Sequence, residues 1–235
     1  MLRRLFLVVC AVLVVTLLGC SSDAESMDVD LEQLSTPVKI LALGDSYTVG
    51  EQVDKLDAWP GRLVRSMRVD GRSVAEPKIV AATGWSSTDL IQAIQLTDLQ
   101  VPFDVVTLQI GVNNQFRQSS IADFERDLAE LTNIAVDLSG GVVGRVVLVS
   151  IPDWSVTPFA EGAPKQQIAG EIDEFNDVIR AHAGTLGAYF VDITQISRRA
   201  VNEPDLIAGD GLHPSGNMYA EWVGLIQPVV EEIID

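Results

Sequence analysis

Two short polar segments that lie far apart in the chain, Gly44-Asp45-Ser46 and Asp210-Gly211-Leu212-His213, contain residue types that can act together in nucleophilic catalysis. A serine hydroxyl is a poor nucleophile at neutral pH and needs a base within hydrogen-bond reach. A neutral imidazole, whose ordinary pKa is about 6.5, can be that base. Together the two segments predict attack by Ser46 on an ester carbonyl. Alone, a Gly-Asp-Ser triplet is more typical of a turn, because all three residue types are favoured there.

The chain contains two histidines, and their surroundings indicate which of them is the base. His182 falls in an amphipathic stretch, 171–183, away from any predicted strand end, so we assign it to the surface of a helix. His213 lies in a loop three residues after Asp210. That spacing lets the Asp210 carboxylate accept the imidazole Nδ1–H and leaves Nε2 free to take the proton of Ser46. A polar turn is the alternative interpretation of Asp210 and His213 taken alone.

Three further groups are candidates to stabilise the oxyanion of a tetrahedral intermediate. They are the backbone N–H groups of Ser46 and Gly84 and the side-chain amide of Asn113. A glycine at position 84 allows the backbone to approach a substrate closely. Taken singly, Gly84 is equally typical of a turn, and Asn113 of a loop cap. Together with the nucleophile and its base, these groups complete the set that an acyl transfer requires.

Five apolar runs separated by longer amphipathic stretches predict the scaffold that must position these residues. This alternation is typical of βαβ units, in which helices cover both faces of a parallel sheet. Ligands bind such sheets in the crevice outside the carboxyl ends of the strands. Because the candidate residues follow the apolar runs, we expect them to meet at that edge. The predicted strands are 38–43, 78–82, 104–110, 145–151 and 188–193.

Amphipathic periodicity predicts the main helices between and after these strands. The clearest is 120–138, where apolar residues recur at spacings of three and four. A second apolar face covers 168–179, and Gly184 is expected to end that helix. A third covers 218–233, where Pro228 is expected to bend the helix by removing one backbone hydrogen bond.

The order of the candidate residues resembles that of the SGNH or GDSL hydrolase family. The matching positions, in chain order, are Ser46, Gly84, Asn113, Asp210 and His213. The resemblance extends from about Val38 to the last helix. It implies a flavodoxin-like three-layer α/β/α sandwich with a five-stranded parallel sheet. It also implies a Ser-His-Asp mechanism without a metal or cofactor, and ester or thioester substrates.

Two positions depart from the common pattern of that family: Tyr47 stands where Leu is usual, and Asn114 where Asp is usual. Neither side chain carries a proton in the expected mechanism, so the departures concern the fit of the substrate. Tyr47, Asn114, Trp85 and Trp154 are candidates to line the substrate pocket, with Phe116 beside them. For each aromatic residue, packing in the core is the alternative. Because the loops are short, we expect an open site that favours short acyl esters over long-chain triglycerides.

The N-terminus has the features of an export signal. Arg3 and Arg4 precede an apolar stretch, 5–18, that is shorter than the roughly 20 residues of a membrane-spanning helix. Leu-Leu-Gly-Cys at 17–20 resembles a bacterial lipobox, which implies cleavage before Cys20 and lipid attachment to its sulfur. An ordinary secretory signal is the alternative. We expect a signal peptide at 1–19, a lipidated and flexible tether at 20–37, and one hydrolase domain at 38–235.

Charge and cysteine content restrict the partners of the exported chain. Of 16 basic side chains, two would leave with the signal, so 14 would face 33 acidic ones, a formal charge of −19. Such a charge argues against nucleic acid as a partner. Cys10 would leave with the signal and Cys20 would be lipidated, so the exported chain would have no thiol for a disulfide or a metal site. We expect a monomer, anchored by lipid to the bacterial cell membrane.

Several functions share these residues, and the sequence leaves them open. The first is hydrolysis of short-acyl carboxylic esters through an acyl-enzyme. The others in the same class are a carbohydrate O-acetylesterase and a lysophospholipase or thioesterase. An alternative of another class is a non-catalytic binding lipoprotein of the cell envelope. Nucleotide binding is disfavoured, because neither Gly-x-Gly-x-x-Gly nor Gly-Lys-Ser/Thr follows the first predicted strand.

Overall fold

Five short apolar segments form a parallel sheet at the centre of the structure. The computed structural model describes residues 36–235, whose strands are β1 (Ile40–Gly44), β2 (Lys78–Ala81), β3 (Val105–Gln109), β4 (Val146–Val149) and β5 (Tyr189–Val191). They are ordered β2-β1-β3-β4-β5, and all neighbouring strands are parallel. Strands β1, β3 and β4 are buried at every position, as is typical of a parallel sheet covered on both faces.

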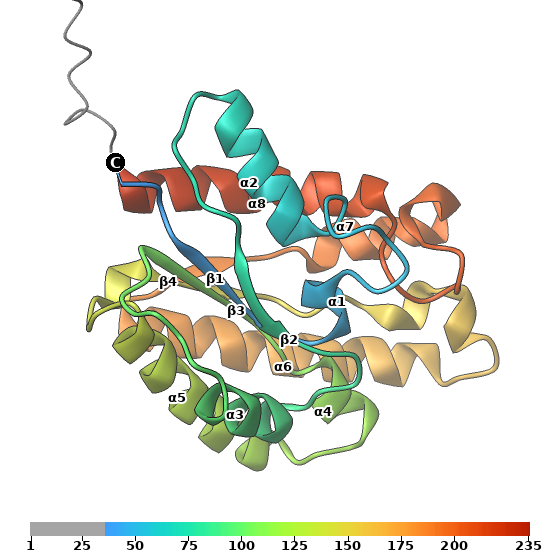
Figure 1. Ribbon diagram of the computed structural model, residues 1–235. Helices are drawn as coiled ribbons and strands as arrows, with labels where there is room; N and C mark the ends of the chain where they lie inside the picture. The colour runs from blue at the N-terminus through green and yellow to red at the C-terminus, as the bar shows by residue number, and fades with distance from the viewer. Residues whose placement is uncertain (1–35) are drawn as a thin grey trace, which may run out of the picture. The chain divides into compact units, whose positions relative to one another are not determined.

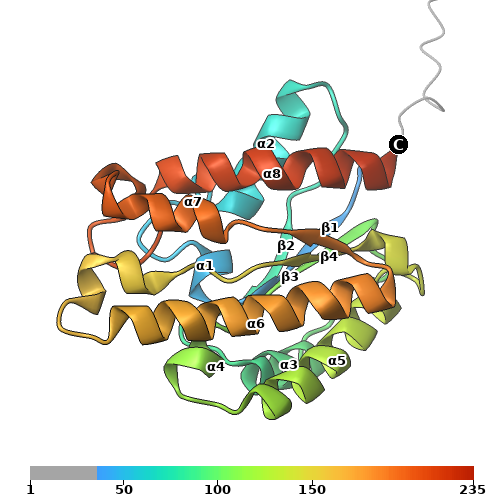
Figure 2. The ribbon, with the colours of Figure 1, turned by 180° about the vertical axis from the view of Figure 1, so that it is seen from behind.

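Helices cover both faces of this sheet, which confirms the predicted three-layer α/β/α sandwich. The α-helices are α1 (Ser46–Val49), α2 (Trp59–Val69), α3 (Ser87–Gln95), α4 (Val112–Phe116), α5 (Ile121–Leu138), α6 (Lys165–Leu186), α7 (Thr194–Arg198) and α8 (Gly216–Ile234). Figure 1 shows α2 and α8 together on one face and α3, α5 and α6 on the other. Figure 2 shows the same layers from behind, with α6 lying along the sheet.

Large apolar side chains fill the space between the helices and the sheet. Trp59 on α2 and Trp222 on α8 are completely buried on one face, and Phe124 on α5 is completely buried on the other. Burying a side chain of this size stabilises the folded state by roughly 1.5–3 kcal/mol relative to leaving it in water. The core therefore holds the strand ends, and the loops that follow them, in a fixed arrangement.

Helix α6 ends later than the sequence predicts. Gly184 lies inside its last turn, and the helix ends at Leu186, with Gly187 in the left-handed conformation at φ 80°. The prediction that the helix ends at Gly184 was wrong, because Gly184 and Gly187 are both typical of a helix end. The N–H groups of Gly187 and Ala188 both donate to the carbonyl of Ala183, which closes the helix at Gly187. Helix α8 continues past Pro228 to Ile234.

No helix within residues 36–235 has both the length and the apolar character needed to cross a membrane. The predicted signal peptide, 1–19, and the predicted lipidation site, Cys20, lie outside the described residues. The predicted tether, 20–37, lies outside them except for its last two residues.

Candidate active site

Ser46 is the first residue of α1, directly after β1 ends at Gly44. Position 44 has no room for a side chain, because a Cβ there would lie 2.2 Å from Oγ1 of Thr48 and 2.6 Å from the carbonyl oxygen of Gln109. Asp45 is the N-cap of α1, and its carboxylate accepts a backbone N–H of the first turn. The tight turn therefore places the Ser46 hydroxyl at the carboxyl edge of the sheet.

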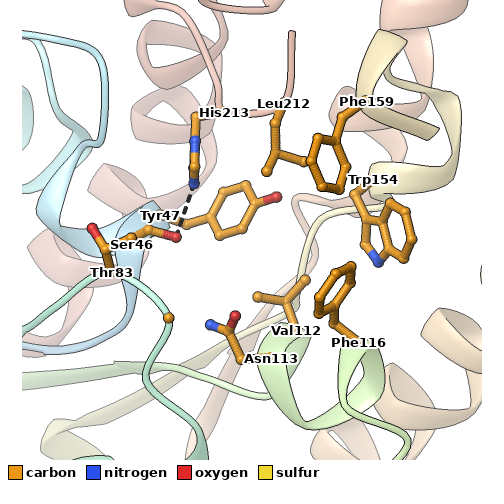
Figure 3. Close-up of a pocket in the computed structure, with 11 residues that line it drawn as sticks. Ser46, Tyr47, Thr83, Val112, Asn113, Phe116, Trp154, Phe159, Leu212 and His213 are labelled. Atoms are coloured by element: carbon orange, nitrogen blue, oxygen red, sulfur yellow. Dashed lines mark hydrogen bonds between the residues drawn. The ribbon is translucent and has the colours of Figure 1, made fainter. Parts of the chain in front are cut away.

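The loop before α8 brings His213 and Asp210 to that hydroxyl. Nε2 of His213 lies 3.0 Å from Oγ of Ser46, and Nδ1 lies 2.5 Å from Oδ2 of Asp210. Figure 3 shows the imidazole pointing at the serine. The other carboxylate oxygen of Asp210 accepts the backbone N–H groups of Leu212 and His213, each at 3.0 Å. The three predicted side chains thus form one hydrogen-bonded chain.

The environment of Asp210 keeps its carboxylate ionised. Partial burial by itself would raise the pKa of this group. Hydrogen bonds from the His213 ring and from two backbone N–H groups outweigh that effect, so the pKa of Asp210 is lowered. A charged Asp210 fixes the tautomer of His213 that has its free lone pair on Nε2, which is the form that can accept a proton from Ser46.

The predicted oxyanion donors lie around the same hydroxyl. Gly84 and Asn113 line the pocket that contains Ser46, and Gly84 has φ +80°, a conformation that other residues rarely adopt. In the described part of the chain, the backbone N–H groups of Ser46 and Gly84 donate no hydrogen bond. Nδ2 of Asn113 donates to the carbonyl of Trp85 at 3.0 Å and lies 3.5 Å from Oδ2 of Asp45. Two backbone donors are therefore free, and the Asn113 amide is held in one orientation.

Asp45 is a buried acid next to the nucleophile. Its side chain is 1% exposed, and this burial raises its pKa to about 7, although hydrogen bonds from the Tyr47 N–H and the Asn113 amide oppose the shift. Asp45 therefore links the turn that contains Ser46 to the side chain of Asn113, and its charge changes near neutral pH.

The pocket in front of Ser46 has a volume of about 160 Å³ and a largely apolar far wall. Three aromatic rings form this wall, with centroid distances of 5.4 Å for Phe116–Trp154, 6.3 Å for Phe116–Phe159 and 6.0 Å for Trp154–Phe159. Val112 lies beside Phe116 in Figure 3, and other apolar atoms come from Leu212. We call Phe116, Trp154 and Phe159 the three-ring wall.

Of the four side chains predicted to line the pocket, the structure places Tyr47 and Trp154 on its surface. The Tyr47 ring lies 5.1 Å from the His213 ring, and burial raises its pKa, so the phenol stays neutral. Trp85 packs against the core instead. Asn114 is buried beside α3, where it accepts the Ser87 N–H at 2.9 Å and donates to the Ser87 hydroxyl at 2.7 Å.

The pocket is also lined by Val112, Phe159 and Leu212, which the sequence pattern did not indicate. Leu212 lies inside the Asp-x-x-His segment, so its position next to His213 was a usable signal. Phe159 comes from the longest loop near the site, and nothing local in the sequence shows that this loop folds back. In the structure the N–H of Phe159 donates to the carbonyl of Gly211 at 2.9 Å, which brings the loop against the histidine segment.

The second histidine lies away from this pocket. His182 is on α6, and its Nε2 is 2.8 Å from the hydroxyl of Thr132 on α5. Partial burial lowers its pKa. Within residues 36–235 there is no group of three or more His, Cys, Asp or Glu side chains arranged to hold a metal ion.

Comparison with known proteins identifies the chain as a hydrolase that acts on ester bonds. The chain belongs to the GDSL-like lipase/acylhydrolase family, whose family model matches residues 42–221. A GDSL lipase of Mycobacterium tuberculosis is 25% identical over 220 residues, which cover 90% of this chain and 88% of that protein.

Solved structures share the fold at low sequence identity. An acetylxylan esterase from Geobacillus stearothermophilus has a TM-score of 0.60 and 18% identity, covering 82% of this chain and 94% of its own. The psychrotrophic esterase EstA from a Pseudoalteromonas species has a TM-score of 0.60 and 14% identity, and the match covers 83% of this chain and 98% of EstA. The crystal structure of TesA has a TM-score of 0.65 and 17% identity, and the match covers 83% of this chain and 99% of TesA.

Proposed function

We propose that the protein is a serine esterase that cleaves carboxylic esters through an acyl-enzyme on Ser46. The observation that supports this is the hydrogen-bonded chain from Asp210 through His213 to the Ser46 hydroxyl, which faces a largely apolar pocket. A nucleophile, its base and the group that orients the base are all within hydrogen-bond reach before any substrate is bound.

In the first half of the reaction, Oγ of Ser46 attacks the acyl carbon, and its proton passes to Nε2 of His213. The negative charge that develops on the carbonyl oxygen is stabilised by the N–H groups of Ser46 and Gly84. The Asn113 amide adds a third donor when its N–H turns from the Asp45 carboxylate to the oxyanion. Asp210 stabilises the imidazolium that forms. The bond from carbon to the alcohol oxygen then breaks, and that oxygen takes the proton from His213.

In the second half, a water molecule attacks the acyl carbon of the ester on Ser46 and gives its proton to His213. The bond to Oγ breaks, Oγ recovers the proton, and the carboxylic acid leaves. Each oxyanion donor contributes roughly 2.7–4 kcal/mol to the lowering of the barrier. The two free backbone N–H groups need no rearrangement to make this contribution.

The direct test is Ser46→Ala, assayed with p-nitrophenyl butyrate and labelled with a fluorophosphonate. We expect turnover to fall at least about 10³-fold and labelling to disappear, while the melting temperature changes little. Ser66→Ala, on α2 away from the pocket, is the matched control and is expected to keep both. Retained turnover in Ser46→Ala would contradict the mechanism. Absence of hydrolysis and labelling in the unmodified protein would instead favour the binding lipoprotein.

The same residues would serve a carbohydrate O-acetylesterase, a lysophospholipase or a thioesterase. The pocket lining favours uncharged esters, because none of its described residues is a lysine, arginine or carboxylate that would pair with a charged group. Acetylated glycan and lysophospholipid, assayed beside p-nitrophenyl esters, would distinguish these substrates by the largest kcat/KM.

We also propose that the enzyme works outside the cytoplasm, tethered through lipid on Cys20. The support comes from the sequence, in which a lipobox-like segment precedes a polar stretch of 20–37. Mass spectrometry of the membrane fraction is expected to show a diacylglyceryl group on Cys20, and Cys20→Ser is expected to release the protein from membranes. An unmodified Cys20 in membrane-bound protein would contradict the proposal.

A further inference from the structure

We propose that the three-ring wall is the acyl-group site, that it takes an uncharged acyl group of about six carbon atoms, and that Phe159 sets this size limit. The inference rests on the serine mechanism proposed above and names the arm of the ester that the wall holds.

The position of the wall relative to the reacting groups assigns it to the acyl arm. In Figure 3, His213 and Asn113 lie on opposite sides of the Ser46 hydroxyl, and the rings lie across the pocket from it. An acyl carbon bound to Ser46 must direct its carbonyl oxygen toward Asn113 and its leaving oxygen toward Nε2 of His213. The direction that remains for the acyl chain is over Val112, toward the rings.

The volume and chemistry of the pocket define the group that fits. Its volume is about 160 Å³. For comparison, an apolar protein cavity of about 150 Å³ binds benzene. A six-carbon chain or a phenyl ring therefore fills the pocket, whereas an acetyl group leaves most of the wall uncovered. The wall itself consists of aromatic rings, so it offers dispersion contacts and no partner for a charge.

Hydrogen bonds hold the inner part of the wall from behind. Nε1 of Trp154 donates to Oε1 of Gln115 at 2.7 Å, and the amide of Gln115 donates to Glu171 at 2.7 Å. The neighbouring Asp153 is paired with Arg198 at 2.8 Å, and Asp153 is 1% exposed. Because the indole is held from behind, an acyl group meets a surface that is already formed, and little ordering free energy opposes binding.

The outer part of the wall is open to solvent. Phe159 is 52% exposed and Phe116 is 54% exposed, although both contact the buried Trp154. Exposed aromatic side chains grouped around a pocket mark a binding surface, because covering them removes apolar area from water. An acyl group that reaches the rings covers this area, and one that is longer must leave the pocket past Phe159.

Phe159 is the residue to change, because its backbone is held independently of its side chain. Its N–H donates to the carbonyl of Gly211 at 2.9 Å, a bond that survives substitution. Phe116 is less suitable, since it ends the helix α4 that also contains Asn113. Phe159→Ala enlarges the pocket at its outer end, and Phe159→Trp shortens it.

The experiment measures kcat/KM of the full chain for p-nitrophenyl acetate, butyrate, hexanoate, octanoate and decanoate. From acetate to hexanoate we expect a rise of about threefold to fourfold for each methylene that enters the pocket. Beyond hexanoate kcat/KM should rise no further. Phe159→Ala should move the optimum to octanoate or longer, and Phe159→Trp should move it to butyrate or shorter.

Leu96→Ala removes an exposed apolar side chain that does not line the pocket, and its chain-length profile should match that of the unmodified protein. A second series, ethyl to hexyl butyrate, varies the alcohol alone. An optimum that stays at the same chain length in both Phe159 variants would overturn the inference. The inference would also be overturned if the Phe159 variants changed kcat/KM in the alcohol series alone. Activity in Ser46→Ala would instead overturn the serine mechanism, so the two failures are distinguishable.

Discussion

Oγ of Ser46 and Nε2 of His213 lie 3.0 Å apart, although 167 positions separate the two residues in the chain. Ser46 is placed by the end of β1, and His213 by the loop that leads into α8. The hydroxyl of Tyr219, on α8, donates to the carbonyl of Tyr47 at 3.0 Å and so ties the two regions together. The nucleophile and its base are therefore positioned by the core of the domain.

The two histidines are expected to differ completely in their effect on turnover. His213→Gln should lower kcat/KM by about 10³-fold or more, because Ser46 loses its base. His182→Gln should change kcat/KM less than twofold, since His182 contacts Thr132 on the far side of the domain. Steady-state kinetics with p-nitrophenyl butyrate test both. A comparable loss in the two variants would mean that His213 is not the base.

Asp210→Asn is expected to lower kcat by about 10³-fold to 10⁴-fold with a small change in KM. The amide can still accept backbone N–H groups, but its NH₂ group no longer accepts the Nδ1–H of His213, so the imidazole loses its orientation. Binding of substrate uses other surfaces and should persist. The kcat and KM of the variant, measured beside its circular dichroism spectrum, test this. A tenfold loss or less would contradict the role of Asp210.

Asp45 should make folding stability depend on pH near neutrality. Burial raises its pKa from 3.8 to about 7, so between these values the folded chain holds a proton that the unfolded chain releases. The stability contributed is therefore complete below pH 3.8 and is lost as the pH rises through about 7. Asp45→Asn has no such titration. The free energy of unfolding of Asp45→Asn, minus that of the unmodified protein, should therefore rise by on the order of a few kcal/mol between pH 4 and pH 8.

Thermal unfolding at several pH values measures this gain. Asp89→Asn is the control of opposite sign, because the N–H of Ser86 lowers the pKa of Asp89 against the effect of partial burial. The stability that Asp89 contributes is present above its ordinary pKa and is lost in acid. The free energy of unfolding of Asp89→Asn should therefore fall furthest below that of the unmodified protein at neutral pH. The same pH trend in both variants would contradict the interpretation of Asp45.

Asp153 should matter for stability more than a surface carboxylate does. It accepts the Arg198 Nε–H at 2.8 Å and the Ser155 N–H at 2.9 Å from a fully buried position. Asp153→Asn leaves Arg198 partly uncompensated and should cost about 2–4 kcal/mol in denaturant unfolding. Asp123→Asn removes an exposed partner of Arg126 and should cost clearly less. Equal losses would contradict the anchoring role of Asp153.

Asn114→Ala is expected to affect both stability and turnover. Without the amide, the N–H of Ser87 is buried with no acceptor, which costs about 1–3 kcal/mol. Because Asn114 also links α4 to α3, the neighbouring Asn113 should lose its fixed position, so kcat should fall more than KM changes. The exposed Asn133 on α5 provides the control, Asn133→Ala. A fully active and fully stable Asn114→Ala would contradict this.

The parallel sheet and the order of its loops were predictable from the sequence because buried strands have a strong local signature. Runs such as 145–151 are apolar and lie between amphipathic stretches, so the alternation of strand and helix follows directly. The end of α6 was not predictable, because Gly184 and Gly187 have the same local preference. The structure decides between them by the hydrogen bonds that the N–H groups of Gly187 and Ala188 donate to the carbonyl of Ala183.

The sequence by itself identified the residue types of an acyl-transfer site and the edge of the sheet where they meet. Only the tertiary structure showed that Asn114 bonds to Ser87 and that Phe159 reaches the pocket. The reason is the range of the interactions concerned. Strand and helix patterns depend on neighbours in the chain, whereas the wall of the pocket depends on a hydrogen bond from Phe159 to Gly211, 52 positions away, which no local pattern encodes.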